Sequence, residues 1–260
     1  LRIVGFPHVH WLPLAADTAH FNAPPSETSS HPPTFVGNSM VEFAARAWNT
    51  VRADTQLAPL AESAFAADAV TRENIGKGLA AVIGADNVEN LDTEQRRHLE
   101  MLFFLEGTRR LRHDSVRALM PHGIQVCGDE GWKSVAENAQ PALNYFHELP
   151  AFYRDCAINL NFTSIQMPSA VNQRVFDCPA AGGFLLSDAQ SGLARLFSEN
   201  EVATFATLDE CRDKLQYFNR DAAARREIVI AARKRILDEH TYAHRLRTIA
   251  NWVMKYFSAA

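Results

Sequence analysis

INLNFTSIQMPSAVNQRVFDCPAAGGFLLSD, residues 158–188, is the stretch that decides the fold. Apolar residues alternate with asparagines over 158–162, and this period of two predicts a strand. Residues 163–172 then predict a loop, and residues 173–181 a short helix that ends at the glycine pair after it. The Phe-Leu-Leu run that follows is typical of a strand buried in a parallel sheet. The order strand, loop, helix, strand predicts an α/β fold with a Rossmann-like parallel sheet.

The loop of this unit is the first candidate for a functional site. In an open α/β sheet, ligands bind beyond the carboxyl ends of the strands, and a helix N-terminus attracts anions. Arg174 lies in the first turn of the predicted helix, where a cation is unfavourable for the helix dipole. We therefore expect Arg174 and the helix start near Asn172 to face an anionic ligand.

A second strand-turn-helix pattern lies near the start of the chain. A short apolar strand ends in Gly37-Asn38-Ser39, and apolar residues recur at helical spacing from Met40 onward. Because it repeats the geometry of the central unit, this turn predicts a second place where backbone N–H groups face an anion.

A third candidate turn follows the strand predicted at residues 122–128. Gly131 in this turn allows the backbone to approach a ligand closely. Trp132 either stacks on a ligand or fills the core, and the sequence leaves both roles open.

Four segments, taken in order, resemble one known family. They are F-V-G-N-S at 35–39, G-I-Q-V-C-G-D-E-G-W at 123–132, N-x-R-V-F-D-x-x-A-x-G-G-F-L-L-S-D at 172–188 and H-T-Y-A-H-R at 240–245. Together they resemble the C-terminal domain of CgeB-like glycosyltransferases of the spore-maturation type, which are relatives of the GT-B enzymes. The resemblance implies a bacterial, cytoplasmic glycosyltransferase whose domain binds a nucleotide-diphospho-sugar.

The resemblance also implies how such a donor would be held. Arg174 and the helix start at Asn172 would neutralise the diphosphate, so no metal and no other cofactor is expected. Asp177 replaces the family's usual glutamate and would accept hydrogen bonds from the ribose hydroxyls. From the residues alone, the alternative is a salt bridge between Arg174 and Asp177 on a surface helix.

Further positions follow from the same resemblance. Phe146 and His147 end a strand predicted at 142–147, and they would flank the nucleotide base. Many retaining relatives carry a first glutamate that falls at Ser169 here, and a serine cannot supply that charge. The stereochemistry is therefore left open, and we assign no catalytic residue.

The domain organisation follows from the spacing of the motifs. Residues 1–33 are expected to be a linker from a missing N-terminal domain, and residues 34–260 the nucleotide-sugar-binding domain. Residues from about 41 to 105 predict a helical insertion, whose task is either acceptor recognition or packing on the missing domain. The arginines in Arg109-Arg110-x-Arg112 are expected on solvated helix faces, because acidic residues interleave them.

Composition and charge limit the kinds of partner that we expect for this chain. A net charge of −4 gives no reason to expect a nucleic acid, and no apolar run is long enough for a membrane span. The four cysteines are scattered, which predicts buried free thiols in a reducing cytoplasm. His8 and His10 have metal-like spacing but lack a third ligand, so no metal site is expected.

The leading hypothesis is a donor-binding domain that transfers a sugar to a glycan or protein acceptor. Two alternatives stay open: a non-catalytic nucleotide-binding or assembly module of the same fold, and a sugar-nucleotide epimerase of the GT-B fold.

Overall fold

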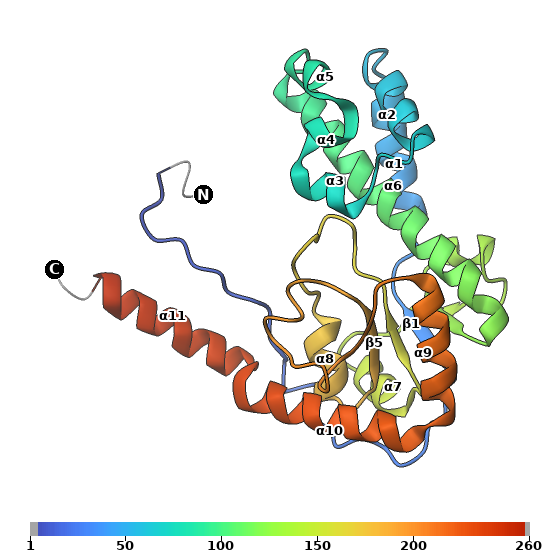
Figure 1. Cartoon of the computed structure of the whole chain (residues 1–260), viewed down its shortest axis with the longest axis vertical. Coiled ribbons are helices and arrows are strands. Elements are labelled where there is room, and N and C mark those ends of the chain that lie inside the picture. The colour runs from blue at the N-terminus through green and yellow to red at the C-terminus, as the bar shows by residue number, and fades with distance from the viewer. Residues whose placement is uncertain (1–4, 258–260) are drawn as a thin grey trace.

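A six-stranded parallel sheet forms the centre of the protein, which we describe from a computed structural model over residues 5–257, the side chain of Phe257 excepted (Figure 1). The outer ends of the predicted linker and domain, 1–4 and 258–260, lie outside the described residues. The strand order is β3-β2-β1-β4-β5-β6, and every neighbouring pair is parallel. The strands are β1 (Thr34–Val36), β2 (Gln125–Gly128), β3 (Gln140–Pro141), β4 (Asn159–Asn161), β5 (Leu185–Asp188) and β6 (Ala203–Phe205). The predicted α/β class with a Rossmann-like parallel sheet is confirmed.

Helices cover both faces of this sheet. The helices that pack on it are the second half of α6 (Thr93–Leu119), α7 (Leu149–Asp155), α8 (Arg174–Ala180), α9 (Leu208–Arg220) and α10 (Ala222–Glu239). The other helices are α1 (Val41–Arg52), α2 (Leu57–Ala66), α3 (Arg72–Lys77), α4 (Leu79–Ile83), α5 (Ala85–Glu89) and α11 (Tyr242–Phe257), and there are short 3-10 turns η2 (Met120–His122) and η3 (Glu130–Ser134). Within residues 5–257, no helix combines the length and the apolar character needed to cross a bilayer.

Two apolar clusters form the core on either side of the sheet. One is contributed by the end of α6, by α9 and by the sheet, and includes Val116, Leu119 and Leu215. The other packs α7 and α8 against the sheet and includes Tyr153 and Phe176. Helix α10 contributes one residue to each cluster and closes the bottom of the domain in Figure 1.

The helical insertion has its own core. Apolar side chains of α1, α2, α4 and the first half of α6 form a separate cluster that includes Val51, Leu57 and Phe103. Helix α6 begins at a capping box, in which Asp92 and Gln95 bond each other's backbone N–H groups at 2.8 and 3.1 Å. The second half of α6 reaches the sheet, so this helix joins the insertion to the α/β fold.

The central unit folds as its sequence predicts. Helix α8 lies within the predicted range 173–181, and the chain then turns at Gly182 with φ of 83°. The N–H groups of Gly182 and Gly183 close the helix on the carbonyls of Pro179 and Cys178 at 3.0 and 2.9 Å. The backbone thereby returns sharply into β5.

The third strand differs from its prediction. It occupies Gln140–Pro141, whereas residues 145–148 form a turn, so the strand predicted at 142–147 is wrong. Asn144 explains the turn, because its Oδ1 accepts from the N–H groups of Phe146 and His147, both at 3.1 Å. An apolar run was mistaken for a strand where an asparagine closes a turn.

The N-terminal segment and α11 leave the body together (Figure 1). His8 stacks on Tyr256 and His10 on Trp252, at ring distances of 3.9 and 4.5 Å. Closer to the body, Ala16 forms a parallel bridge with Thr241, the residue before α11.

Candidate functional site

The candidate site lies where the strand order reverses. Strand β1 has β2 on one side and β4 on the other, so the chain connections diverge there and leave a crevice at the carboxyl ends. A cavity of about 390 Å³ opens at this edge. Its lining comes from the ends of β1 and β2, the turn before α7 and the start of α8, and includes Gly37, Asn38, Tyr145, Asn172 and Arg174.

Arg174 extends from the first turn of α8 to the carboxyl ends of β1 and β4. Its Nη2 donates to the carbonyl of Val36, and its Nη1 donates to the carbonyl of Leu160 and to Oδ1 of Asn161, both at 3.1 Å. Its Nε donates to the hydroxyl of Tyr153 at 3.3 Å. All four acceptors are uncharged. Because arginine has five N–H donors, these bonds leave one of them for a ligand.

The alternative salt bridge between Arg174 and Asp177 does not form among the described residues; the two side chains bond different groups. Helix α8 has seven residues, so its dipole adds little to the site. The positive charge at this edge therefore comes from a guanidinium.

Asp177 is enclosed by the fold. Its Oδ2 accepts from the hydroxyl of Tyr145, and its Oδ1 accepts from Nε2 of Gln173 at 2.9 Å and from the N–H of Asp17 at 3.3 Å. Burial raises the pKa of the Asp177 carboxyl, against the effect of these hydrogen bonds. The predicted contact with ribose would require Tyr145 to leave first. In the structure, Asp177 instead joins α8 to the predicted linker.

The turn after β1 already holds a carboxylate. The N–H of Ser39 donates to Oδ2 of Asp129 at 2.7 Å, its hydroxyl donates to Oδ1, and the N–H of Gly131 also donates to Oδ1 at 2.9 Å. Burial opposes the ionisation of Asp129, but these bonds outweigh burial and lower the pKa of its carboxyl. Ser39 and Gly131 therefore bind an internal carboxylate, and neither lines the cavity. Only Gly37 and Asn38 of this turn line the cavity.

Trp132 belongs to the core. It is fully buried, its Nε1 donates to the carbonyl of Gly37 at 2.7 Å, and its ring stacks on His113 at 5.0 Å. Of the two roles that the sequence left open, stacking on a ligand is excluded by this burial. Gly128 beneath it has no room for a side chain, because a Cβ there would lie 2.2 Å from the same carbonyl.

Of the remaining predicted residues, Asn172 lines the cavity, whereas Phe146, His147 and Ser169 do not. Phe146 and His147 are exposed in the turn after β3, and the ring of Phe146 contacts His20 at 4.6 Å. Ser169 is exposed in the loop before α8, and its carbonyl packs against Gly192. Asn172 does line the cavity; its Nδ2 donates to Asn161 at 2.7 Å, and its buried Oδ1 has no partner. This oxygen is an acceptor that a ligand hydroxyl would satisfy.

Arg112 is a charged residue of this edge that sequence reasoning missed. We expected it on a solvated face, but it is half-buried and donates to the carbonyl of Asn38 at 2.9 Å and to Oγ of Ser164 at 3.2 Å. A signal was present in the sequence. Arg109 and Arg110 have Glu106 three and four residues before them, whereas no acidic residue lies three or four positions from Arg112.

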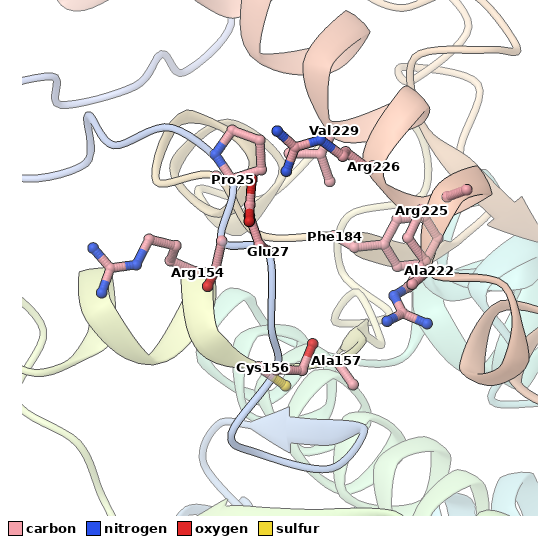
Figure 2. Close-up of a pocket in the computed structure, with 14 residues that line it drawn as sticks. Pro25, Glu27, Arg154, Cys156, Ala157, Phe184, Ala222, Arg225, Arg226 and Val229 are labelled. Carbon is pink, nitrogen blue, oxygen red and sulfur yellow. The ribbon is translucent and has the colours of Figure 1, made fainter.

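A second cavity of about 250 Å³ lies at the opposite edge of the sheet, near the amino ends of β4 and β5 (Figure 2). Its arginines come from α7 and α10. Arg154 is paired with Asp155 at 2.8 Å, and Arg225 donates to the carbonyl of Phe218. Ligands of open α/β sheets bind at the carboxyl edge, so the β1/β4 edge remains the better candidate.

The cysteines are all buried and free, as the sequence predicts. Burial raises the pKa of each thiol, so none is an activated nucleophile. Within residues 5–257, no three histidine, cysteine, aspartate or glutamate side chains gather as metal ligands.

Comparison with known proteins identifies a family for this chain. No curated protein matches the sequence. Among solved structures, sucrose-phosphate synthase from Thermosynechococcus elongatus is similar, with a TM-score of 0.49 and 14% identity over 58% of this chain. The match covers 44% of that protein, so the chain spans less than half of its length. The family model described as "Glycosyl transferase-like" matches residues 97–251, more than half of the chain and a stretch that contains both Arg112 and Arg174. The chain therefore belongs to the glycosyl transferase-like family.

Proposed function

We propose that the cavity at the β1/β4 edge binds the diphosphate of a nucleotide-diphospho-sugar, and that the chain is the donor-binding domain of a glycosyltransferase acting on a glycan or protein acceptor. The observation that carries the proposal is the guanidinium of Arg174, which enters this cavity with only uncharged acceptors around it. A desolvated cation without a carboxylate partner favours an anionic ligand.

The chemistry of sugar transfer needs such a group. As the anomeric bond to the diphosphate breaks, negative charge develops on the leaving oxygen, and cations already in place lower the barrier. The guanidinium is held by four bonds, so it requires no rearrangement when charge develops. The buried unpaired oxygen of Asn172 offers an acceptor for a hydroxyl of the same ligand.

Thermal unfolding tests the proposal. Uridine or guanosine diphosphate at about 100 times its dissociation constant is expected to raise the melting temperature by a few degrees, roughly 3–6 °C. Arg174→Ala is expected to abolish the rise. The matched control is Arg233→Ala, because Arg233 also donates to a carbonyl and to an asparagine oxygen, those of Ala23 and Asn22 at 2.8 and 2.7 Å, but lies outside the cavity. Absence of a shift with any nucleoside diphosphate, or an equal loss in the control, would overturn the proposal.

A non-catalytic nucleotide-binding module is the second candidate. One observation favours it: the carboxylates nearest the cavity, Asp129 and Asp177, are both bonded within the fold. Measuring sugar release from nucleotide sugars, with and without acceptor, separates the two functions. Turnover that depends on Arg174 supports the transferase, and binding without turnover supports the module.

A further inference from the structure

We propose that Arg112, on the long helix that joins the insertion to the sheet, is a second phosphate-binding residue, so that Arg112 and Arg174 together hold the two phosphate groups of a diphosphate. This inference rests on the proposed function and assigns a task to the second half of α6, which brings Arg112 to the ends of the strands.

Both arginines form hydrogen bonds with the two segments where β1 and β4 end. Arg174 bonds the carbonyls of Val36 and Leu160, at the ends of β1 and β4. Arg112 bonds Asn38 and Ser164, which lie a few residues farther along the same two connections. Both guanidiniums also lie near the ring of Phe35, at 5.8 Å for Arg112 and 5.3 Å for Arg174.

Arg112 keeps most of its donors. It uses two N–H groups in the bonds described above, and its buried Nε has no partner. Of its five donors, one on Nη1 and one on Nη2 therefore remain for a ligand, compared with one on Arg174, and the Nε–H is buried without an acceptor. Guanidinium groups with free donors pair readily with phosphate oxygens.

The charge on Arg112 is uncompensated at close range. Burial, and then the charge of Arg174, lower the pKa of Arg112 to about 10. Asp129 and Asp188 oppose this effect from a distance, but each is bonded elsewhere, Asp129 to Ser39 and Asp188 to Arg72 at 2.7 Å. Two partly desolvated cations that repel each other are unfavourable for the fold alone, and an anion between them removes that cost.

Calorimetric titration with inorganic pyrophosphate and with inorganic phosphate tests the inference without requiring nucleoside recognition. Measurements are made at one low ionic strength and without divalent cations. The wild-type chain is expected to bind pyrophosphate more tightly than phosphate. Arg112→Met is expected to weaken pyrophosphate binding at least about tenfold and to change phosphate binding at Arg174 by less than about threefold.

Arg117→Met is the matched control. Arg117 lies on the same helix, is exposed and pairs with Asp114 at 2.7 Å, so the substitution removes one charge away from the site. Its effect on pyrophosphate is expected to stay within about twofold. Arg112→Lys is the second variant, in case Arg112→Met does not fold. Lysine keeps the positive charge but lacks the several N–H donors of the planar guanidinium. Its affinity for pyrophosphate is expected to lie between those of wild type and Arg112→Met.

The outcomes separate the two proposals. If Arg112 variants bind pyrophosphate as wild type does, or if the control loses as much affinity, the inference is overturned, whether or not Arg174 supports nucleotide binding. If pyrophosphate binds through Arg112 but no nucleoside diphosphate binds, the two-arginine site stands and the proposed function fails. If the wild-type chain binds neither, both fail.

Discussion

Arginines on a single helix, α6, have opposite electrostatic surroundings. Arg109 and Arg110 share the buried carboxylate of Glu106, with Nε–O distances of 2.6 and 2.8 Å. Arg112, less than one turn later, bonds only uncharged groups and faces the cation of Arg174. The first two arginines are neutralised within α6, whereas Arg112 has no close carboxylate and lies at the carboxyl ends of the strands, where open α/β folds bind ligands. Arginines that are close together in the sequence therefore have different electrostatic surroundings, and the presence or absence of a nearby carboxylate distinguishes them.

The largest expected effect comes from removing the carboxylate that Arg109 and Arg110 share. Glu106→Gln leaves two guanidiniums without their carboxylate in a half-buried position, so we expect a loss of about 2 kcal/mol in the free energy of unfolding. Urea unfolding measures it. Glu94→Gln is the control on the same helix, because its pair with Arg97 is exposed and is expected to contribute less than about 0.5 kcal/mol. Equal, small losses would mean that the two arginine groups do not differ as described.

A second substitution, Arg72→Met, would strengthen the attraction between Arg112 and a nearby carboxylate, that of Asp188. Arg72 donates to the carboxylate of Asp188 and to the carbonyl of Thr163, at 2.7 and 2.6 Å, and thus ties α3 to the end of β5. Arg72→Met is expected to cost about 1–2 kcal/mol of stability. It also leaves Asp188, which keeps its hydrogen bonds from Thr163 and Gln190, without a neighbouring cation, so its attraction to Arg112 grows and pyrophosphate affinity is expected to fall several-fold. Unchanged affinity in a folded variant would show that Asp188 does not reach Arg112.

Removing Arg112 itself should affect stability in the opposite direction. Arg112→Met ends the repulsion with Arg174 and the desolvation of one guanidinium, so in anion-free buffer we expect unfolding stability to stay equal or to rise by up to about 1 kcal/mol. The acceptors it leaves, at Asn38 and Ser164, are exposed or half-buried and can bind water. Urea unfolding with and without pyrophosphate gives both values. A loss above about 1 kcal/mol in the free energy of unfolding would show that Arg112 stabilises the fold.

The smallest expected effect is a dependence on pH next to this arginine. Burial lowers the pKa of His113, and the charge of Arg109 adds to that effect; burial also lowers the pKa of His240. A lowered folded pKa means that the unfolded chain binds the proton more readily. Stability is therefore lost as the pH falls below about 6.5, the usual value for histidine. Urea midpoints between pH 7.5 and 5.5 measure the slope, and His113→Gln should flatten it. If His113→Gln leaves the slope unchanged, the pH dependence of stability comes from other groups.

The sequence predicted the fold well because its signals are local. Alternation in 158–162 and the glycine pair after α8 each act within a few residues, and each appears in the structure. The third strand was misplaced for the same local reason: the side chain of Asn144 closes a turn that an apolar run conceals.

The site was predicted less completely. Gly37, Asn38, Asn172 and Arg174 do line one cavity, because parallel strands with consecutive turns bring them to one edge. Ser39, Trp132 and Asp177 do not line it, since partners from far along the chain, such as Asp129 and Tyr145, use their polar groups. No local pattern reports such partners, because they are separated by tens of residues in sequence.

The sequence by itself determined the secondary structure of the central unit, the parallel sheet and the position of Arg174 at a helix start, since period, turn residues and capping depend on neighbouring residues. Only the tertiary structure decided which polar groups remain available. Burial and long-range hydrogen bonds enclose Asp177, satisfy Ser39, and bring Arg112 on α6 to the strand ends that Arg174 also bridges. The free energy of a charged group depends on everything within a few ångströms of it, and folding alone assembles that environment.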